Sequence, residues 1–431
     1  MPDPSYGPAE AAADARLSIA LIHDRARVLI GSGAAVPLVL LDAFCARAPA
    51  LRDVEVCQLL TLGPAPYSAP AYQGHVRHNA FFVGPNTREA VQSGRADFTP
   101  ICLSEIATMM RTSLPIDVAL VQLSPPDVHG FCSLGVSVDI VKPAIDSAKV
   151  VLAELNCRMP RTHGDAFVHV SRLSRITIVD HPLPELVAEP LDDVARAIGE
   201  HVAGLVQDGD TLQLGIGTIP NAVLAALRSH RDLGIHTEMF SDGVVDLVER
   251  GVVTNAKKTL HRGKLVTSFV MGTKSLYDFV NDNPALEMHP SHYVNDPFVI
   301  AKNRGMVAVN SAISIDLTGQ VCADSIGPRI HSGVGGQLDF IRGAARSEGG
   351  KPVIAMPSTA KDGTVSRIVA ELAPGSGVTT SRADVHWVVT EFGAVNLHGK
   401  SLRERARALI GLAAPPYRDA LAAAARERHW I

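Results

Sequence analysis

The sequence predicts an α/β protein made of two similar open α/β domains in tandem. The chain has 431 residues, more than one typical hydrophobic core needs. Its 35 glycines and 28 prolines, with 46% hydrophobic residues, suit alternating strands and helices with many tight connections. A strand, a Gly-x-Gly turn, a proline and a helix follow one another at 28–44 and again at 211–227. We therefore expect one domain over 1–190 and a second over 191–431.

The first half alternates between apolar runs and turn residues. After a lead-in without regular structure at 1–14, we expect a helix at 15–27, followed by a strand at 28–30 and the turn Gly31-Ser32-Gly33. Apolar strands are expected at 54–62 and 117–124. Three prolines then punctuate residues 173–190, and such a segment is typical of a domain boundary.

The second half opens with an amphipathic helix at 192–207 and a compact unit at 211–243. In that unit, a short strand leads into the turn Gly215-Ile216-Gly217, and Pro220 suits the first turn of the next helix. A second strand is expected at 235–240, with Glu238 near its end. A strand-turn-helix-strand unit presents backbone amides and this carboxylate at one edge of a sheet.

Other interpretations of this unit are a dinucleotide site, a zinc deaminase and an ordinary βαβ unit with a solvated glutamate. Glu238 follows Gly217 at the spacing of a ribose-binding acid, but the third glycine of a dinucleotide fingerprint is missing. A deaminase is suggested by His236-x-Glu238, but its P-C-x-x-C partner is absent from the chain. The ordinary unit remains open on this stretch alone.

Two later segments offer hydrogen-bond donors. Asn310 interrupts the apolar run 306–317, so it is either a structural hydrogen-bonding group or a donor to a ligand. The loop 332–340 (SGVGGQLDF) contains paired glycines, and such loops expose consecutive N–H groups that can hold an anion or an oxyanion.

Composition excludes several functional classes. A net charge of −4 and a pI of about 6.5 provide no basic surface for nucleic acid. The N-terminus lacks a basic signal-peptide segment, and no apolar run is long enough to span a bilayer. The six cysteines contain no C-x-x-C pair, and His75 and His78 have no third metal ligand nearby. We expect a cytoplasmic protein without a metal, a nucleic-acid partner or a membrane partner.

Several motifs in order resemble the acetyl-CoA hydrolase/transferase family, most closely its 4-hydroxybutyrate CoA-transferase branch. The resemblance covers about residues 28–418. It rests on these segments: GSGAAVP (31–37), FFVGPNTREAVQSGRADFTPI (81–101), SPPDVHGFCSLG (124–135), LQLGIGTIPNAVL (212–224), GIHTEMFSDGVVDLVERG (234–251), YVNDP (293–297), SGVGGQLDFIRGA (332–344) and VVTEFG (388–393). The chain departs from the family pattern at Asn221, where an aspartate is usual, and at 414–417, where His-Pro-Asp-Phe is usual.

The resemblance implies a nucleophile and a CoA site. The position that matches the family's attacking carboxylate is Glu238, and the expected oxyanion donors are the backbone of Gly336 and the side chain of Asn310. The chemistry requires that the Gly336 loop lie within a few ångströms of the Glu238 carboxylate. The expected CoA-contacting residues are Gly215, Ile216, Gly217, Thr218, Ile219, Ile313, Gly336 and Met356.

We therefore expect an enzyme that moves CoA between short-chain carboxylic acids through a glutamyl-CoA thioester. The alternatives are acyl-CoA hydrolysis by the same glutamate and a non-catalytic acyl-CoA-binding module, and the retained glutamate argues against mere binding. Plausible acids are 4-hydroxybutyrate, butyrate, propionate, succinate and itaconate, exchanged with acetyl-CoA or succinyl-CoA. The resemblance also implies a homodimer or homotetramer.

Overall fold

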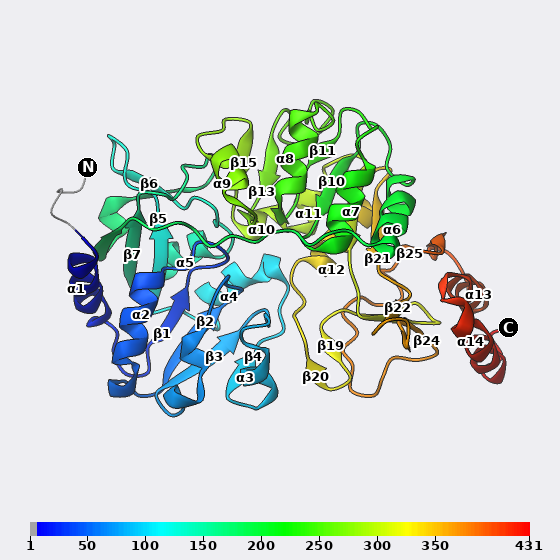
Figure 1. The fold of residues 1–431 in the computed structure, drawn as a ribbon, viewed down its shortest axis with the longest axis horizontal. Helices are drawn as coiled ribbons and strands as arrows, with labels where there is room; N and C mark the ends of the chain where they lie inside the picture. The colour runs from blue at the N-terminus through cyan, green and yellow to red at the C-terminus, as the bar shows by residue number, and fades with distance from the viewer. Residues whose placement is uncertain (1–6) are drawn as a thin grey trace. The chain divides into compact units, whose positions relative to one another are not determined.

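The computed structural model describes residues 7–431, which divide by their contacts into two compact units. The first unit comprises residues up to 187 together with 266–294, and the second comprises 188–265 and 295–431. Each unit has its own largely parallel sheet with helices on both faces, so the α/β class is confirmed (Figure 1). The predicted domain bounds assign 266–294 differently, and they remain a prediction about folding domains.

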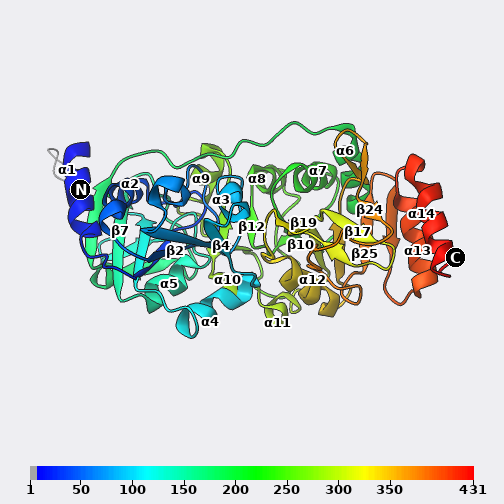
Figure 2. The same cartoon turned by 90° about the horizontal axis from the view of Figure 1, so that it is seen from below.

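The first unit is built on a seven-stranded parallel sheet in the order β4-β3-β2-β1-β5-β7-β9. Every residue of β5 is buried, as is typical of a central parallel strand. Helices α1 and α2 lie over one face and α4 and α5 over the other (Figure 2). The main strands are β1 Arg27–Ile30, β2 Val54–Gln58, β3 Val76–Ala80, β4 Ala96–Phe98, β5 Val118–Leu123, β7 Val150–Asn156 and β9 Arg175–Val179. The helices are α1 Pro8–Ile19, α2 Leu38–Arg47, α3 Arg88–Gln92, α4 Ile106–Arg111, α5 Val141–Ser147, α9 Lys274–Val280 and α10 Ser291–Val294. Smaller strands are β6 Phe131–Ser133, β8 Phe167–His169, β14 Phe269–Val270 and β15 Leu286–Met288, and β13 Leu265–Thr267 crosses the unit boundary.

The second unit is built on a six-stranded sheet in the order β11-β10-β16-β21-β25-β26. Its strands are parallel except for the antiparallel β25–β26 hairpin. Helices α6 and α7 lie over one face and α12 over the other (Figure 2). The main strands are β10 Thr211–Leu214, β11 Gly234–Ile235, β16 Met306–Asn310, β21 Lys351–Ala355, β25 Trp387–Thr390 and β26 Gly393–Asn396. The helices are α6 Asp193–Ala203, α7 Thr218–Ala226, α8 Asp242–Glu249, α11 Pro297–Ile300, α12 Gln337–Arg346, α13 Leu402–Leu412 and α14 Pro415–Glu427. Smaller strands are β12 Met239–Phe240, β17 Ser314–Asp316, β18 Val321–Cys322, β19 Ser325–Ile326, β20 Arg329–Ile330, β22 Thr359–Ala360, β23 Val365–Ser366 and β24 Ile368–Val369.

The repeated sequence pattern corresponds to a repeated topology. Strand β1 precedes the first Gly-x-Gly turn and lies between β2 and β5. Strand β10 precedes the second turn and lies between β11 and β16. In each unit, the next strand of the sheet in sequence is therefore added on one side and a later strand on the other.

Two expected elements have different bounds. The first helix begins at Pro8 and ends at Ile19, so it takes up part of the expected lead-in, whose residues 1–6 lie outside the described part. The strand expected at 235–240 is broken: β11 ends at Ile235, and Glu238 lies in the bend before β12. No helix within residues 7–431 combines the length and apolarity needed to cross a bilayer.

Candidate functional site

Glu238 lies just past the carboxyl end of β11, in the second unit. The hydroxyl of its neighbour Thr237 donates to the carbonyl of Leu214 at 2.8 Å, and the Leu214 N–H lies 3.3 Å from the same hydroxyl. Leu214 is the last residue of β10 and immediately precedes the Gly-x-Gly turn. The Thr237 side chain therefore holds the Glu238 segment beside the end of β10, at the edge where open α/β sheets bind ligands.

A buried amide holds the Glu238 carboxylate. The Nδ2 of Asn295 donates to the Oε2 of Glu238 at 2.8 Å, and the Asn295 side chain has no exposed surface. The Oδ1 of Asn295 is buried without a hydrogen-bond partner. Asn295 belongs to the YVNDP segment (293–297). The sequence did not predict a role for this residue. Hydrogen bonds to a charged acceptor are strong, so this one fixes the carboxylate in place.

Gly336 lies against the same two groups. A Cβ placed on Gly336 would come within 1.9 Å of the Glu238 Oε2 and 2.2 Å of the Asn295 Nδ2. The φ of Gly336 is −95°, so space and not backbone conformation requires glycine. The structure thus brings Glu238, Asn295 and Gly336 together, and the expected closeness of the glycine loop to the carboxylate is confirmed. Its oxyanion role stays a prediction.

The carboxylate also lies near a helix N-terminus. Gly336 is the N-cap residue of α12, a helix of 10 residues. The N-terminus of a helix carries a partial positive charge and unpaired N–H groups. Negative charge on Glu238, or on an oxyanion formed there, is therefore favoured at this position.

A cavity of about 370 Å³ in the same unit collects most of the expected CoA-contacting turn. Four of its lining residues were predicted as CoA contacts: Gly215, Ile216, Thr218 and Ile219. Asn310 lines it as well, and the remaining lining residues are Asp192, Ala195, Pro220, Val309, Ser311, Pro357 and Arg367. The lining combines apolar surface with a few polar groups, as small-molecule sites commonly do.

Asn310 ends β16 and pairs with a neighbouring strand. Its Nδ2 donates to the Gln213 Oε1 at 3.1 Å, and the Gln213 Nε2 lies 3.5 Å from the Asn310 Oδ1. The paired amides hold the ends of β10 and β16 together. Asn310 therefore makes structural hydrogen bonds and also lines the cavity, and its role as a donor to a ligand stays a prediction.

The other expected contact residues are not among the residues that line this cavity. Gly217, with a φ of 104°, is the N-cap of α7 and is not among the lining residues. Ile313 is half-buried between β16 and β17, and its N–H donates to the Cys322 carbonyl. Met356 has no exposed surface and packs in the hydrophobic core. The next residue, Pro357, lines the cavity, and a contact of Met356 with CoA stays a prediction.

Two residues in and beside the cavity escaped sequence reasoning. Arg367 is half-buried, and burial lowers the pKa of its guanidinium while the charge of Glu391 acts in the opposite direction. Both oxygens of Glu391 accept hydrogen bonds from Ser358, at 2.6 Å and 2.9 Å. Neither residue stands in a pattern that indicates a ligand from sequence.

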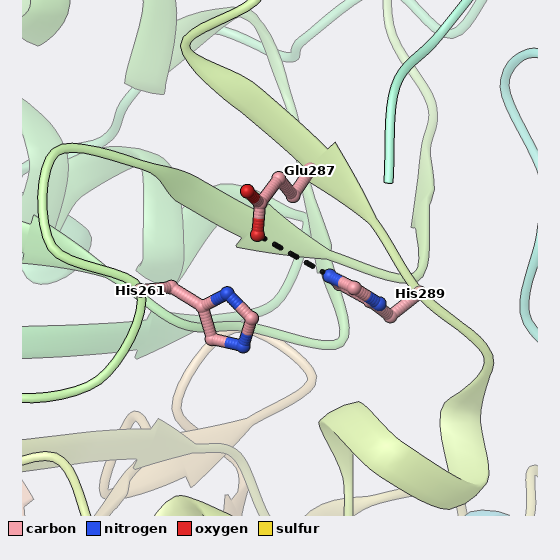
Figure 3. Close-up of side chains that lie close together, drawn as sticks. All are labelled: His261, Glu287 and His289. Atoms are coloured by element: carbon pink, nitrogen blue, oxygen red, sulfur yellow. Dashed lines mark hydrogen bonds and ion pairs between the residues drawn. The ribbon is translucent and has the colours of Figure 1, made fainter. Parts of the chain in front are cut away.

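Neither His75 nor His78 belongs to a cluster of three potential metal ligands within residues 7–431. His78 is buried in β3, where burial lowers its pKa to about 4. In the same unit the His289 Nε2 lies 3.4 Å from the Glu287 Oε2 (Figure 3). His261, also drawn there, belongs to the other unit.

Comparisons with known proteins agree with this arrangement. The family model of the acetyl-CoA hydrolase/transferase N-terminal domain matches residues 11–187, and that of the C-terminal domain matches 272–425. The 4-hydroxybutyrate coenzyme A transferase of Clostridium kluyveri is 52% identical over 94% of this chain and 95% of its own length. A succinyl-CoA:acetate/propanoyl-CoA:succinate CoA transferase of Fasciola hepatica is 48% identical over 94% and 86%. The crystal structure of a 4-hydroxybutyrate CoA-transferase from Porphyromonas gingivalis superposes with a TM-score of 0.83 at 42% identity, covering 97% of each chain.

Two matched domains in tandem, and relatives similar over almost the whole chain, leave one conclusion. The chain belongs to the acetyl-CoA hydrolase/transferase family and is a CoA-transferase of that family.

Proposed function

We propose that this enzyme moves CoA between short-chain carboxylic acids through a covalent glutamyl-CoA thioester on Glu238. One observation carries the proposal. The Glu238 carboxylate is held by the Asn295 amide against Gly336, at the N-terminus of α12. A carboxylate fixed beside unpaired N–H groups can act as a nucleophile and has stabilisation ready for the oxyanion that its attack creates.

The reaction is a sequence of balanced acyl and thioester exchanges. The Glu238 carboxylate attacks the acyl-CoA carbonyl, which forms an acyl-glutamyl anhydride and releases the CoA thiolate. The thiolate attacks the glutamyl carbonyl, which forms the glutamyl-CoA thioester and releases the first carboxylate. An acceptor carboxylate then reverses both steps, regenerates Glu238 and leaves as the new acyl-CoA. Covalent catalysis divides one difficult exchange into steps with lower barriers.

Each step passes through an oxyanion, for which we assign donors. The Gly336 N–H is the principal donor and Asn310 a second one, and a single such donor is worth about 3–4 kcal/mol. The CoA-contacting surface consists of the turn Gly215–Ile219 with Ile313 beside it. Asn221, where the family usually has aspartate, accepts a hydrogen bond from the Ser241 hydroxyl at 3.2 Å. The Ser241 hydroxyl therefore donates to a neutral amide here and not to the carboxylate that an aspartate would provide.

The acids exchanged are of the 4-hydroxybutyrate or butyrate type, or small dicarboxylates, with acetyl-CoA or succinyl-CoA as donor. The names of the relatives from Clostridium kluyveri and Fasciola hepatica support this range. Such an enzyme fits a cytoplasmic homodimer or homotetramer with no metal in the reaction. We also propose 1–190 and 191–431 as its folding domains.

Acceptor dependence tests the proposal. The purified protein is mixed with acetyl-CoA or succinyl-CoA, with and without 4-hydroxybutyrate, butyrate, propionate or succinate. We expect the acyl-CoA of the acceptor to form and initial rates to follow ping-pong kinetics. If free CoA accumulates at a rate that no acceptor changes, the enzyme is a hydrolase and the transferase proposal is wrong.

The intermediate is tested separately. Incubation with acyl-CoA and no acceptor should leave a CoA adduct on the peptide that contains Glu238, and Glu238→Ala should abolish both adduct and exchange. Glu249→Ala, which removes an exposed carboxylate in α8, should keep both. An adduct on a cysteine such as Cys322, or full activity of Glu238→Ala, would contradict the assignment.

A further inference from the structure

Arg367 lines the same cavity as the Gly-x-Gly turn. It lies between β23 and β24, its N–H donates to the Ser358 carbonyl at 2.8 Å, and its carbonyl accepts the N–H of Ile315 at 2.9 Å. Its side chain lines the cavity of about 370 Å³ together with residues of the turn. The backbone hydrogen bonds fix the main chain of Arg367, and a hydrogen bond from its Nη1 to the Ala312 carbonyl holds the guanidinium.

The guanidinium of Arg367 forms no ion pair among residues 7–431. Its Nη1 donates to the Ala312 carbonyl at 3.2 Å, and no described carboxylate forms an ion pair with it. The carboxylate of Glu391 is occupied by Ser358. A half-buried guanidinium is costly to leave without an anion, and burial correspondingly lowers its pKa. The guanidinium is therefore engaged by a backbone carbonyl and not by an ion pair, although the charge of Glu391 acts on it.

A second source of positive potential borders the same cavity. Thr218 and Ile219 begin α7, a helix of nine residues whose first N–H groups have no partner within the helix. The acidic group in the lining, Asp192, accepts the Ala195 N–H at 2.7 Å and so caps α6. Guanidinium and helix N-terminus together suit an anion with several acceptor oxygens.

We propose that Arg367 and the N-terminal amides of α7 bind a phosphate group of the ADP portion of CoA, either the 3′-phosphate or the pyrophosphate. This inference rests on the proposed function, because it assumes that acyl-CoA is the substrate. A phosphate fits better than the carboxylate of a short acid, because Glu238, Asn295 and Gly336 are not among the lining residues. A short acid must stay at Glu238 to react, whereas the phosphates are separated from the sulfur by the pantetheine arm. Arginine pairs with phosphate oxygens through two parallel hydrogen bonds.

The test compares Arg367→Gln with the wild type on three donors of decreasing size. These are acetyl-CoA, acetyl-dephospho-CoA, which lacks only the 3′-phosphate, and S-acetylpantetheine, which lacks the whole 3′-phospho-ADP portion. Arg304→Gln is the matched control, because Arg304 is an exposed arginine of the same unit that pairs with Glu348 at 3.4 Å outside this cavity. Calorimetric binding of CoA without an acceptor measures affinity independently of turnover. Thermal unfolding and the charge-conserving Arg367→Lys show whether the variant folds.

We expect Arg367→Gln to raise the KM for acetyl-CoA and the Kd of CoA about tenfold to a hundredfold, the loss that removal of a charge-assisted hydrogen bond gives. The kcat should change little, Arg367→Lys should lose less, and Arg304→Gln should behave as wild type. With S-acetylpantetheine, the KM ratio between variant and wild type should return to about one. With acetyl-dephospho-CoA, a KM ratio that stays high identifies the pyrophosphate as the group that Arg367 binds. A KM ratio of about one with this donor identifies the 3′-phosphate.

Three results would overturn the proposal. One is an equal loss on S-acetylpantetheine, which would assign Arg367 to the pantetheine arm or to structure. Another is a rise confined to the KM of the acceptor carboxylate, which would assign it to the acid. The third is an unchanged Kd of CoA in Arg367→Gln. Failure of the proposed function would look different, because CoA would then bind without any exchange between acids.

Discussion

At the residue scale, the site depends on an absent side chain. The Cα of Gly336 touches the Glu238 carboxylate and the Asn295 amide. Gly336→Ala should displace the carboxylate and lower turnover by about a hundredfold, because misplacing a reacting group by an ångström has such an effect. Turnover and thermal unfolding of the purified variant give the measurement.

Gly411→Ala is the matched control, because a Cβ there meets no atom within 4 Å and the residue lies in α13. It should leave turnover unchanged and raise stability by about 0.5–1 kcal/mol, as expected for alanine in a helix. Wild-type turnover in Gly336→Ala would show that Gly336 only forms a turn.

A second prediction at this scale concerns Asn295. Asn295→Ala removes the hydrogen bond that orients Glu238 and should lower kcat about tenfold to a hundredfold with a smaller change in KM. Asn303→Ala is the control, since Asn303 is equally buried and its Nδ2 donates only to the Ile300 carbonyl. That variant should lose stability without a specific loss of kcat. If the two substitutions lower kcat and stability equally, Asn295 contributes to packing and does not specifically orient Glu238.

At the element scale, a buried carboxylate holds the first turn of α2. The Glu154 side chain has no exposed surface, and its Oε1 accepts the N–H of Leu40 at 2.6 Å. The His181 Nε2 lies 3.4 Å from the other oxygen. The hydrogen bond to Glu154 holds the pKa of His181 above its usual value, although burial opposes it. Protonated His181 therefore helps to hold Glu154, and through it the start of α2.

This pair predicts a pH dependence of stability. A histidine with a raised pKa in the folded state contributes its full stabilisation below the unfolded pKa of about 6.5 and loses it as pH rises through the folded value. The melting temperature should therefore fall more steeply between pH 6 and pH 8.5 in the wild type than in His181→Gln. If the melting temperatures of the two proteins change equally with pH across this range, His181 is not the cause of the pH dependence.

The elements also show where sequence patterns fail. The stretch 251–272 is rich in basic residues, as solvated loops often are, but Lys258 within it is only 3% exposed. Its Nζ donates to the Ile235 carbonyl at 2.7 Å and to the Lys264 carbonyl at 2.8 Å. A charged residue in a polar loop gives no local sign of burial, because the carbonyls that satisfy it come from other elements. The capping box of α13, Ser401 with Glu404, is by contrast local and visible in the sequence SLRE.

At the scale of the whole molecule, the contact units predict how a nicked chain behaves. Residues 187–190 are exposed and irregular, and Val187 is 72% exposed. Limited proteolysis should therefore cut near residue 190, as at other exposed linkers. Because 266–294 packs within the first unit, the two fragments should co-elute in native buffer and separate only in denaturant. Fragments that separate freely in native buffer would mean that 1–190 holds together without 266–294.

The sequence by itself determined the α/β class, the repeated strand-turn-helix pattern and the family. These depend on local spacing: apolar runs of strand length, glycines at tight turns and motifs in a fixed order. It also predicted that Glu238 and the Gly336 loop lie together, because attack at a carbonyl requires both at one atom.

Only the tertiary structure decided which other residues join them. Asn295 reaches Glu238 because the loop before α11 returns to the end of β11, and Arg367 enters the cavity because hydrogen bonds to Ser358 and Ile315 fix its backbone. Met356 was assigned to the ligand surface by resemblance, and only the structure shows that its side chain packs in the core. Such assignments depend on contacts between segments far apart in the chain, and no local pattern encodes them.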